Sequence, residues 1–195
     1  MTGPRASGSD ATLPRGRVTF TVFHSMDDQM LIAWARFRHP FVVRSAEASP
    51  RPARSMSRAV STRTSHRPTP GRPEEGSPGL WRLFATNNRE LGRSFHLYSS
   101  VEAARMHVER LQGDEARLEI DIVPGPLTSS RGWMITHEGS PVMTSSRWYA
   151  SSSTGSEAAV GALAAFVRAL ISPVVDHGPS SGAGRPRILG ASADA

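Results

Sequence analysis

The sequence of 195 residues contains no cysteine, which excludes disulfides, catalytic thiols and zinc sites with cysteine ligands. It contains no lysine either: all 23 basic residues are arginine, so a preference for arginine at any one site cannot be inferred. The longest apolar stretch, residues 158–171, is too short to cross a bilayer and contains Arg168. The N-terminus has no basic start followed by an apolar core, as a signal peptide would have. We therefore expect a cytoplasmic protein that does not associate with membranes.

The net charge of +6 is distributed unevenly along the chain. Residues 1–78 contain 12 arginines and 6 acidic residues, whereas residues 79–178 contain 9 arginines and 10 acidic residues. A nucleic-acid-binding domain normally carries its basic patch on the folded surface. The charge therefore predicts, at most, nonspecific phosphate contacts made by an Arg-rich N-terminal arm.

Residues 1–78 are rich in Arg, Pro and Ser and are predicted to be mostly disordered, because they bury too little apolar surface to offset the entropy of ordering. Two short patterns interrupt this composition. Apolar residues alternate with threonine over residues 18–22, which predicts a strand. The pair Ser25 and Asp28 predicts the start of a short helix that ends before Pro40. Nothing in the remaining sequence marks a partner for these elements, so we expect them to pack weakly or not at all.

Two segments of the chain, residues 81–111 and 133–166, repeat each other. Each begins with tryptophan and continues with a short strand, a turn, a returning strand that contains Ser and Tyr, and an Ala-rich helix. Capping boxes, in which a hydroxyl and a later Glu satisfy the first backbone N–H groups of a helix, are predicted to begin at Ser99 and Thr154. With these boxes aligned, the second segment has four extra residues before its helix.

Alternating apolar residues at positions 118–122 predict one further strand between the two segments. A hairpin and one helix are too small to form a core alone, whereas two such units can share one sheet. Residues 79–172 are therefore predicted to form a single α+β domain of tandem ββα repeats. The expected order is β-β-α-β-β-β-α, with an antiparallel sheet packed against two helices. Residues 44–78 are predicted to be a linker and residues 173–195 a flexible tail.

A set of residues recurs in the same order in both segments: Trp81, Asn87, Ser94, Tyr98, Ser99 and Ala103 in the first, and Trp133, Gly139, Ser145, Tyr149 and Ala158 in the second. This order resembles the YegP-like family of small bacterial domains of unknown function, which often occur as tandem repeats. The match covers about half of the chain, and the Gly that often precedes the family's Tyr is replaced by Leu97 and Trp148. The resemblance implies a compact ββα tandem fold. It implies no known reaction, cofactor or catalytic residue.

No catalytic or metal-binding constellation is recognisable in the sequence. The stretch Gly92–His96 is similar to a nucleophile elbow around Ser94, but it lacks the final Gly and lies in a predicted strand. The seven histidines lack the local spacing of metal ligands, and acidic residues do not cluster around them. We therefore assign no catalytic, cofactor-binding or metal-binding residue.

Tyr98 and Tyr149 are the only tyrosines, and they occupy equivalent positions in the two segments. As an exposed pair they would form a stacking platform, with Arg147 beside them and His96 on the same face as Tyr98. The alternative, which we favour, is that both rings anchor the corner between strand and helix with their hydroxyls hydrogen-bonded. These four residues are the candidate interaction surface.

The predicted function follows from a repeated core that lacks a convergent polar site. A sheet of this kind leaves edge strands, and edge strands favour pairing with another chain. We therefore expect a non-enzymatic module for protein–protein interaction or for self-association into a homo-oligomer. The alternative is a nucleic-acid-binding accessory protein, in which the Arg-rich arm contacts phosphates and the sheet supplies aromatic side chains.

Overall fold

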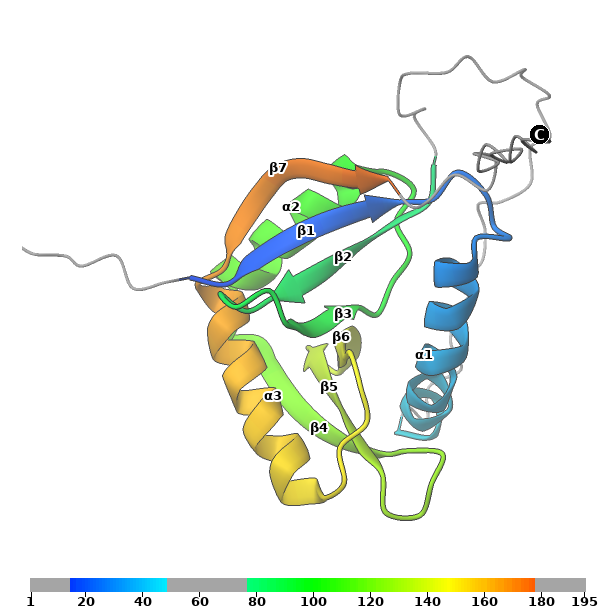
Figure 1. Cartoon of the computed structure of the whole chain (residues 1–195). Helices are drawn as coiled ribbons and strands as arrows, with labels where there is room; N and C mark the ends of the chain where they lie inside the picture. Colours follow the sequence, from blue (N-terminus) through cyan, green and yellow to red (C-terminus); the bar gives the residue numbers. More distant parts are fainter. Residues whose placement is uncertain (1–14, 49–76, 178–195) are drawn as a thin grey trace, which may run out of the picture.

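The computed structural model describes residues 15–48 and 77–177, which fold into a mixed α+β architecture (Figure 1). A seven-stranded sheet is covered by α-helices on both faces, as the α+β prediction requires in its general form. The elements are β1 (Arg17–Val22), α1 (Gln29–Ala48), β2 (Gly79–Phe84), β3 (Glu90–Ser94), α2 (Val101–Gly113), a 3-10 turn η1 (Glu115–Arg117), β4 (Leu118–Pro124), β5 (Arg131–His137), β6 (Ser140–Ser145), α3 (Ser152–Val167) and β7 (Leu170–His177).

The strand order across the sheet is β4-β5-β6-β3-β2-β1-β7. All neighbours are antiparallel except β1 and β7, which are parallel. The short pairing of β3 with β6, over Gly92–Ser94, joins the half of the sheet that contains the first hairpin to the half that contains the second. The predicted hairpins and the predicted strand at 118–122 are confirmed.

Strand β1 is an integral part of the sheet, where it lies between β2 and the edge strand β7. The predicted strand at 18–22 is confirmed, but the expectation that it packs weakly or not at all is wrong, because Val18 and Phe20 are fully buried in the main core. The domain therefore does not begin at residue 79. The pairing of β1 with β2 was invisible to local pattern reading because a long Arg-, Pro- and Ser-rich segment separates the two strands in the sequence.

The two halves of the sheet have the same arrangement of three strands. Phe20 of β1 lies opposite Trp81 of β2, and Ile122 of β4 lies opposite Trp133 of β5. The first unit therefore consists of β1, β2, β3 and α2, and the second of β4, β5, β6 and α3. The predicted order β-β-α-β-β-β-α missed the first strand of the first unit.

Helix α1 is longer than predicted and runs through Pro40 to Ala48. Its first turn is capped by Asp28, whose carboxylate accepts a hydrogen bond from the backbone N–H of Met30 at 2.8 Å. The prediction that this helix ends before the proline was wrong, as was the assignment of residues 44–48 to a linker. Tertiary packing compensates for the backbone hydrogen bond that proline removes, since Phe41 is fully buried against the sheet.

The residues after α3 form an edge strand, β7, beside β1. The predicted flexible tail is therefore wrong for residues 173–177. Ile171 and Val175 pack against the main core, although the strand is exposed for most of its length. The predictions for residues 1–14, 49–76 and 178–195, including disorder and the Arg-rich arm, lie outside the described residues.

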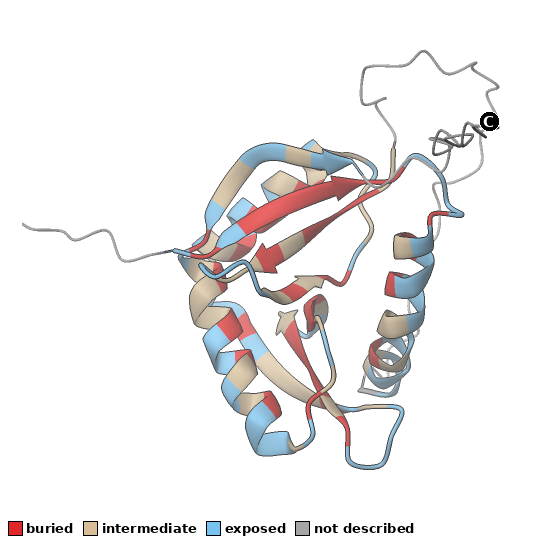
Figure 2. Ribbon diagram, in the orientation of Figure 1, coloured by how far each residue is buried: buried red, intermediate tan, exposed pale blue. Residues whose placement is uncertain are grey.

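Buried residues lie along the strands and on the sides of the helices that face the sheet (Figure 2). The sheet separates two apolar layers, and neighbouring residues of a strand enter different layers. Trp81 and Trp133 face α2 and α3, whereas Leu80 and Met134 face α1. Figure 1 shows α1 on the opposite side of the sheet from α2 and α3. Among the helices of the described residues, none has the length and apolar character needed to cross a membrane.

Both helices that follow the hairpins begin at a serine cap. Ser100 accepts a hydrogen bond from the backbone N–H of Ala103, and Ser151 accepts one from Thr154. The predicted capping boxes at Ser99 and Thr154 were therefore wrong. When Ser100 and Ser151 are aligned, α2 and α3 begin at equivalent positions, and no insertion precedes α3. The second unit differs instead in the length of its helix, because α3 extends further than α2.

Candidate functional site

Tyr98 and Tyr149 anchor the turn that follows each hairpin. The indole N–H of Trp81 donates to the hydroxyl of Tyr98 at 3.2 Å, and that of Trp133 donates to the hydroxyl of Tyr149 at 3.4 Å. Tyr149 is 8% exposed, and each tyrosine also forms a backbone bridge to the start of its own hairpin. Because both rings are buried or half-buried, they do not form an exposed stacking platform.

The four residues of the candidate interaction surface divide between two places. His96 and Tyr98 lie beside α2, where their rings are 6.4 Å apart. Arg147 and Tyr149 lie beside α3, where the guanidinium of Arg147 is 5.1 Å from the centre of the Tyr149 ring. Each pair lines or borders its own groove, so the structure does not join the four residues into one surface.

Each groove lies between the helix of one unit and the hairpin of the other. The α3 groove, of about 760 Å³, separates α3 from the β2–β3 hairpin. The α2 groove, of about 470 Å³, separates α2 from the β5–β6 hairpin. The two grooves are built from equivalent positions: Arg147, Ala158, Gly161 and Arg168 of the α3 groove correspond to His96, His107, Arg110 and Arg117 of the α2 groove.

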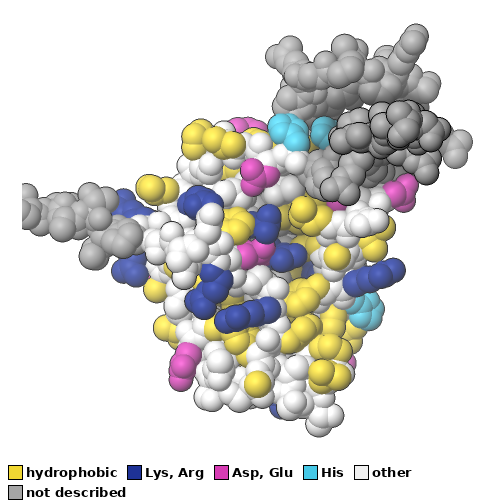
Figure 3. All heavy atoms as spheres, viewed as in Figure 1, with side chains coloured by type: hydrophobic (Ala, Val, Ile, Leu, Met, Phe, Trp, Pro, Cys, Tyr) yellow, Lys and Arg dark blue, Asp and Glu magenta, His cyan; other side chains and the backbone are white. Residues whose placement is uncertain are grey.

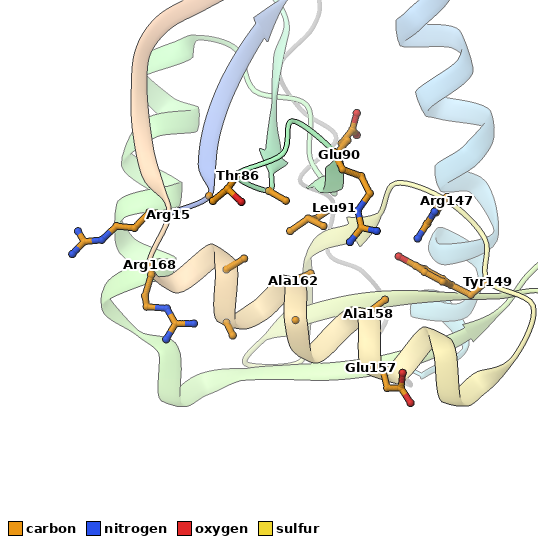
Figure 4. Close-up of a pocket in the computed structure, with 16 residues that line it drawn as sticks. Arg15, Thr86, Glu90, Leu91, Arg147, Tyr149, Glu157, Ala158, Ala162 and Arg168 are labelled. Carbon is orange, nitrogen blue, oxygen red and sulfur yellow. The ribbon is translucent and has the colours of Figure 1, made fainter. Parts of the chain in front are cut away.

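The α3 groove has an apolar floor because α3 presents small residues to it (Figure 4). Ala158, Gly161, Ala162 and Ala165 follow each other at the three- and four-residue spacing of one helix face. Leu91 of β3 lies across from this face. No side chain of α3 is long enough to fill the space between the helix and the hairpin, so the groove stays open.

Four arginines surround this floor: Arg15, Arg89, Arg147 and Arg168. All four are exposed, and none forms an ion pair with a residue that the structure describes. Figure 4 shows Arg147 at one end of the groove and Arg15 with Arg168 at the other. Seen from outside, arginine side chains gather over this region of the molecule (Figure 3).

The two acidic side chains at the α3 groove leave this positive charge uncompensated. Glu90 is held by Arg82 and Arg93, with N–O distances of 2.5 and 2.6 Å. Glu157 is exposed at the outer side of α3 (Figure 4). The groove therefore combines an apolar floor with a basic rim, which is the chemistry that recognises an anionic partner with apolar parts.

In the α2 groove, in contrast, several polar side chains are paired with one another. The hydroxyl of Tyr98 is hydrogen-bonded to Nδ1 of His107 at 2.5 Å. His137 contacts the carboxylate of Asp114 at 2.8 Å. Arg117, which corresponds to Arg168, pairs with the carboxylate of Glu138 at 2.5 Å. These contacts occupy most of the charged groups that line the α2 groove, with Arg110 left without an ion pair among the described residues, so the α3 groove is the better candidate site.

Burial controls the protonation of the α2 groove. Desolvation, followed by the positive charge of Arg110 and the nearby histidines, lowers the pKa of His107 from 6.5 to about 4. The neutral imidazole is the form that accepts the proton of Tyr98. The same desolvation raises the pKa of Tyr98, so this pair stays uncharged near neutral pH.

We expect the protein to lose stability as the pH falls from 6.5 to about 4. In this window the unfolded state binds a proton at His107 that the folded state does not, so the free energy of unfolding rises with pH. Solvent screening of this half-buried group reduces the effect to the order of 1 kcal/mol. Urea denaturation at several pH values measures it. His107→Gln, which keeps an acceptor for Tyr98, should show a flatter pH dependence; an unchanged slope in this variant would contradict the assignment.

The structure also shows the surroundings of Ser94, which the sequence offered as a possible nucleophile, and of the possible metal ligands. Ser94 is fully buried and donates to the backbone carbonyl of His96 at 2.8 Å, while it accepts from the N–H of Trp81, so it has a structural position and not that of an exposed nucleophile. Within residues 15–48 and 77–177, no three His, Asp or Glu side chains are grouped as metal ligands.

Sequence analysis missed most of the α3 groove. Arg15, Arg89 and Arg168 come from distant segments, and nothing in their local sequence connects them. The one usable signal was the run of alanine and glycine on α3, whose helical spacing marks a face without large side chains.

Comparisons with known proteins assign neither a family nor a function. No protein-family model matches the chain. No curated protein matches it either. The chain is similar to the solution NMR structure of YegP from E. coli, a protein of unknown function, at 17% sequence identity and a TM-score of 0.36. The similar region covers 53% of this chain and 85% of the YegP chain. Membership of the YegP-like family stays a prediction.

Proposed function

We propose that the protein is a non-enzymatic protein-interaction module and that its partner binds in the α3 groove. The observation that carries this proposal is the difference between the two equivalent grooves. The α2 groove is occupied by its own ion pairs and by the Tyr98–His107 hydrogen bond. The α3 groove has small side chains in the same places and arginines without described ion-pair partners.

The sheet edges are a weaker basis for association than the sequence suggested. Strand β7 has Pro173 in its middle, which removes a backbone donor, and β4 presents Glu119 and Asp121. Both features oppose strand pairing with another chain. Self-association through an edge is therefore a less favourable form of the proposal than binding in the α3 groove.

A nucleic-acid-binding function remains the alternative for the Arg-rich arm, most of which lies outside the described residues. The sheet does not offer the aromatic platform that this alternative invoked. Trp81 and Trp133 are fully buried, and the hydroxyls of both tyrosines accept hydrogen bonds from them. Base stacking needs exposed ring faces, so the folded domain favours a protein partner.

The proposal is tested by filling the groove. Gly161 is exposed, and a Cβ at this position meets no heavy atom within 4 Å. Gly161→Trp places a large side chain over the floor, while Gly161→Ala is the matched control, since both replace a helical glycine. Cross-linking in cells followed by mass spectrometry should identify a partner with the wild type and with Gly161→Ala, and the purified partner should bind these two proteins at least tenfold more tightly than Gly161→Trp.

Binding of the purified partner that is equal in all three proteins would overturn the groove as the binding site. Self-association is followed by analytical ultracentrifugation of the full chain. A dimer that persists in Gly161→Trp would assign association to another surface and would likewise count against the proposal.

A further inference from the structure

Resting on the proposed function, we infer that the α3 groove recognises an extended acidic segment of a partner protein, with an acidic residue at each end and an apolar residue between them. The α2 groove is the internal reference for the α3 groove, because the two are built from equivalent positions. In that groove the chain itself supplies the acceptors and carboxylates that are missing from the α3 groove.

The first group that the α3 groove lacks is a hydrogen-bond acceptor beside Tyr149. The hydroxyl of Tyr98 accepts a hydrogen bond from Trp81 and forms a second hydrogen bond with Nδ1 of His107. Tyr149 accepts in the same way from Trp133, but Ala158 occupies the position of His107 and has no acceptor. Among the described residues, nothing accepts the proton of this buried hydroxyl, which points into the groove (Figure 4).

A carboxylate is the acceptor that fits this end of the groove. It would accept the hydroxyl proton of Tyr149 and pair with the guanidinium of Arg147, which lies over the same ring. Hydrogen bonds to ionised acceptors are roughly twice as strong as neutral ones. A backbone carbonyl would satisfy the hydroxyl but would leave the charge of Arg147 unpaired.

The second group that the α3 groove lacks is a carboxylate beside Arg168, at the other end of α3. In the α2 groove, Arg117 pairs with Glu138 of the facing turn and also with Asp114. In the α3 groove, Arg168 and Thr86 of the opposite turn both line the groove, and Ala165 takes the position of the aspartate. Arg168 therefore lacks both carboxylates that its counterpart has. A second acidic side chain from the partner supplies this charge.

The distance between the two ends sets the spacing of the acidic residues. At about 1.5 Å of rise per residue, α3 advances about 15 Å from Ala158 to Arg168. An extended chain advances about 13 Å over four residues, and residues two and four apart point to the same side. The predicted sequence is therefore acidic, any residue, apolar, any residue, acidic. The middle side chain then lies over Ala162 and faces Leu91.

The inference is tested by fluorescence anisotropy with the full chain and short labelled peptides blocked at both termini. The probe is Glu-Thr-Leu-Thr-Glu. Two controls are Gln-Thr-Leu-Thr-Gln, which removes the charges, and Glu-Thr-Leu-Glu-Thr, which moves one carboxylate to the opposite side of the strand. We expect the probe to bind at least tenfold more tightly than either control. Arg147→Gln and Arg168→Gln should each weaken its binding about fivefold.

The sharpest variant restores the missing carboxylate within the chain. Thr86 is exposed in the turn, and Thr86→Glu places an acid where Glu138 lies in the α2 groove. This acid should pair with Arg168 and weaken probe binding about tenfold, whereas Thr86→Gln should leave binding within about twofold. Comparing Thr86→Glu with Thr86→Gln separates the effect of the added charge from that of the larger side chain. Thr86 lies outside the core, so both variants should fold.

Equal binding of the Glu and Gln peptides, or equal effects of Thr86→Glu and Thr86→Gln, would overturn the inference. The inference would also be overturned if a single-stranded DNA oligonucleotide bound more tightly than the probe and lost its binding in Gly161→Trp. That result would assign the groove to nucleic acid. If a purified partner binds in a Gly161-dependent manner but is insensitive to Thr86→Glu, the inference fails while the proposed function stands.

Discussion

Replacing Phe20 by alanine should lower the free energy of unfolding by about 4 kcal/mol, the cost typical of truncating a buried phenylalanine. The side chain is 1% exposed, lies opposite Trp81 in the neighbouring strand and packs in the core between the sheet and the α2–α3 layer. The guanidinium of Arg105 of α2 also lies over the Phe20 ring, 4.9 Å from its centre, and alanine cannot make this contact. Urea denaturation monitored by circular dichroism measures the effect.

The matched control is Met26→Ala, because Met26 belongs to the same N-terminal part of the chain and is 64% exposed. This change should alter stability by no more than about 0.5 kcal/mol. A small effect of Phe20→Ala would mean that residues 77–177 form the domain without β1. The full loss would show that the N-terminal strand is part of one cooperative unit with the hairpins.

Gly132→Val should destabilise the protein by about 3 kcal/mol and release α1 from the sheet. A Cβ at Gly132 would lie 2.6 Å from Cζ of Phe41 and 2.7 Å from Cζ3 of Trp148. These two rings stack at 5.1 Å and hold α1 against β5 and β6, so neither can move without opening the layer. Limited proteolysis should cut α1 in the variant at denaturant concentrations where the wild type resists.

Gly113→Ala is the control, because a Cβ at Gly113 meets no heavy atom within 4 Å. It should leave stability unchanged or slightly raised, since alanine is the better helix residue. If Gly132→Val were as stable as this control, the aromatic contact between α1 and the sheet would not contribute to stability.

The local elements were the part of the fold that sequence reading predicted well. Alternating apolar residues marked the strands around Val18 and Leu118, and the turn residues marked the hairpins. Helix boundaries were less accurate, since several polar residues precede α3 and the wrong one was chosen as the cap. The cap depends on which hydroxyl meets a free backbone N–H, and a run of Ser and Thr offers many.

The groove was largely beyond sequence reading because its parts meet only after two units share a sheet. Arg147 and Tyr149 were selected as neighbours in the chain, and both line the α3 groove. His96 and Tyr98 were selected by the same logic, yet in their groove Asp114 and Glu138, which come from other elements, pair with His137 and Arg117. Equivalent positions therefore gave different chemistry.

By itself the sequence determined most of the elements, the α+β class and the correspondence between Trp81 and Trp133, Ser94 and Ser145, and the two tyrosines. These follow from local periodicity and from residues with one conformational preference. Only the tertiary structure decided that β1 and β7 complete the sheet, that α1 covers its second face, and that carboxylates pair with Arg117 in one groove but not with Arg168 in the equivalent one. The reason is physical: strand pairing, layer packing and the compensation of charge depend on contacts between residues far apart in the chain, which no local pattern records.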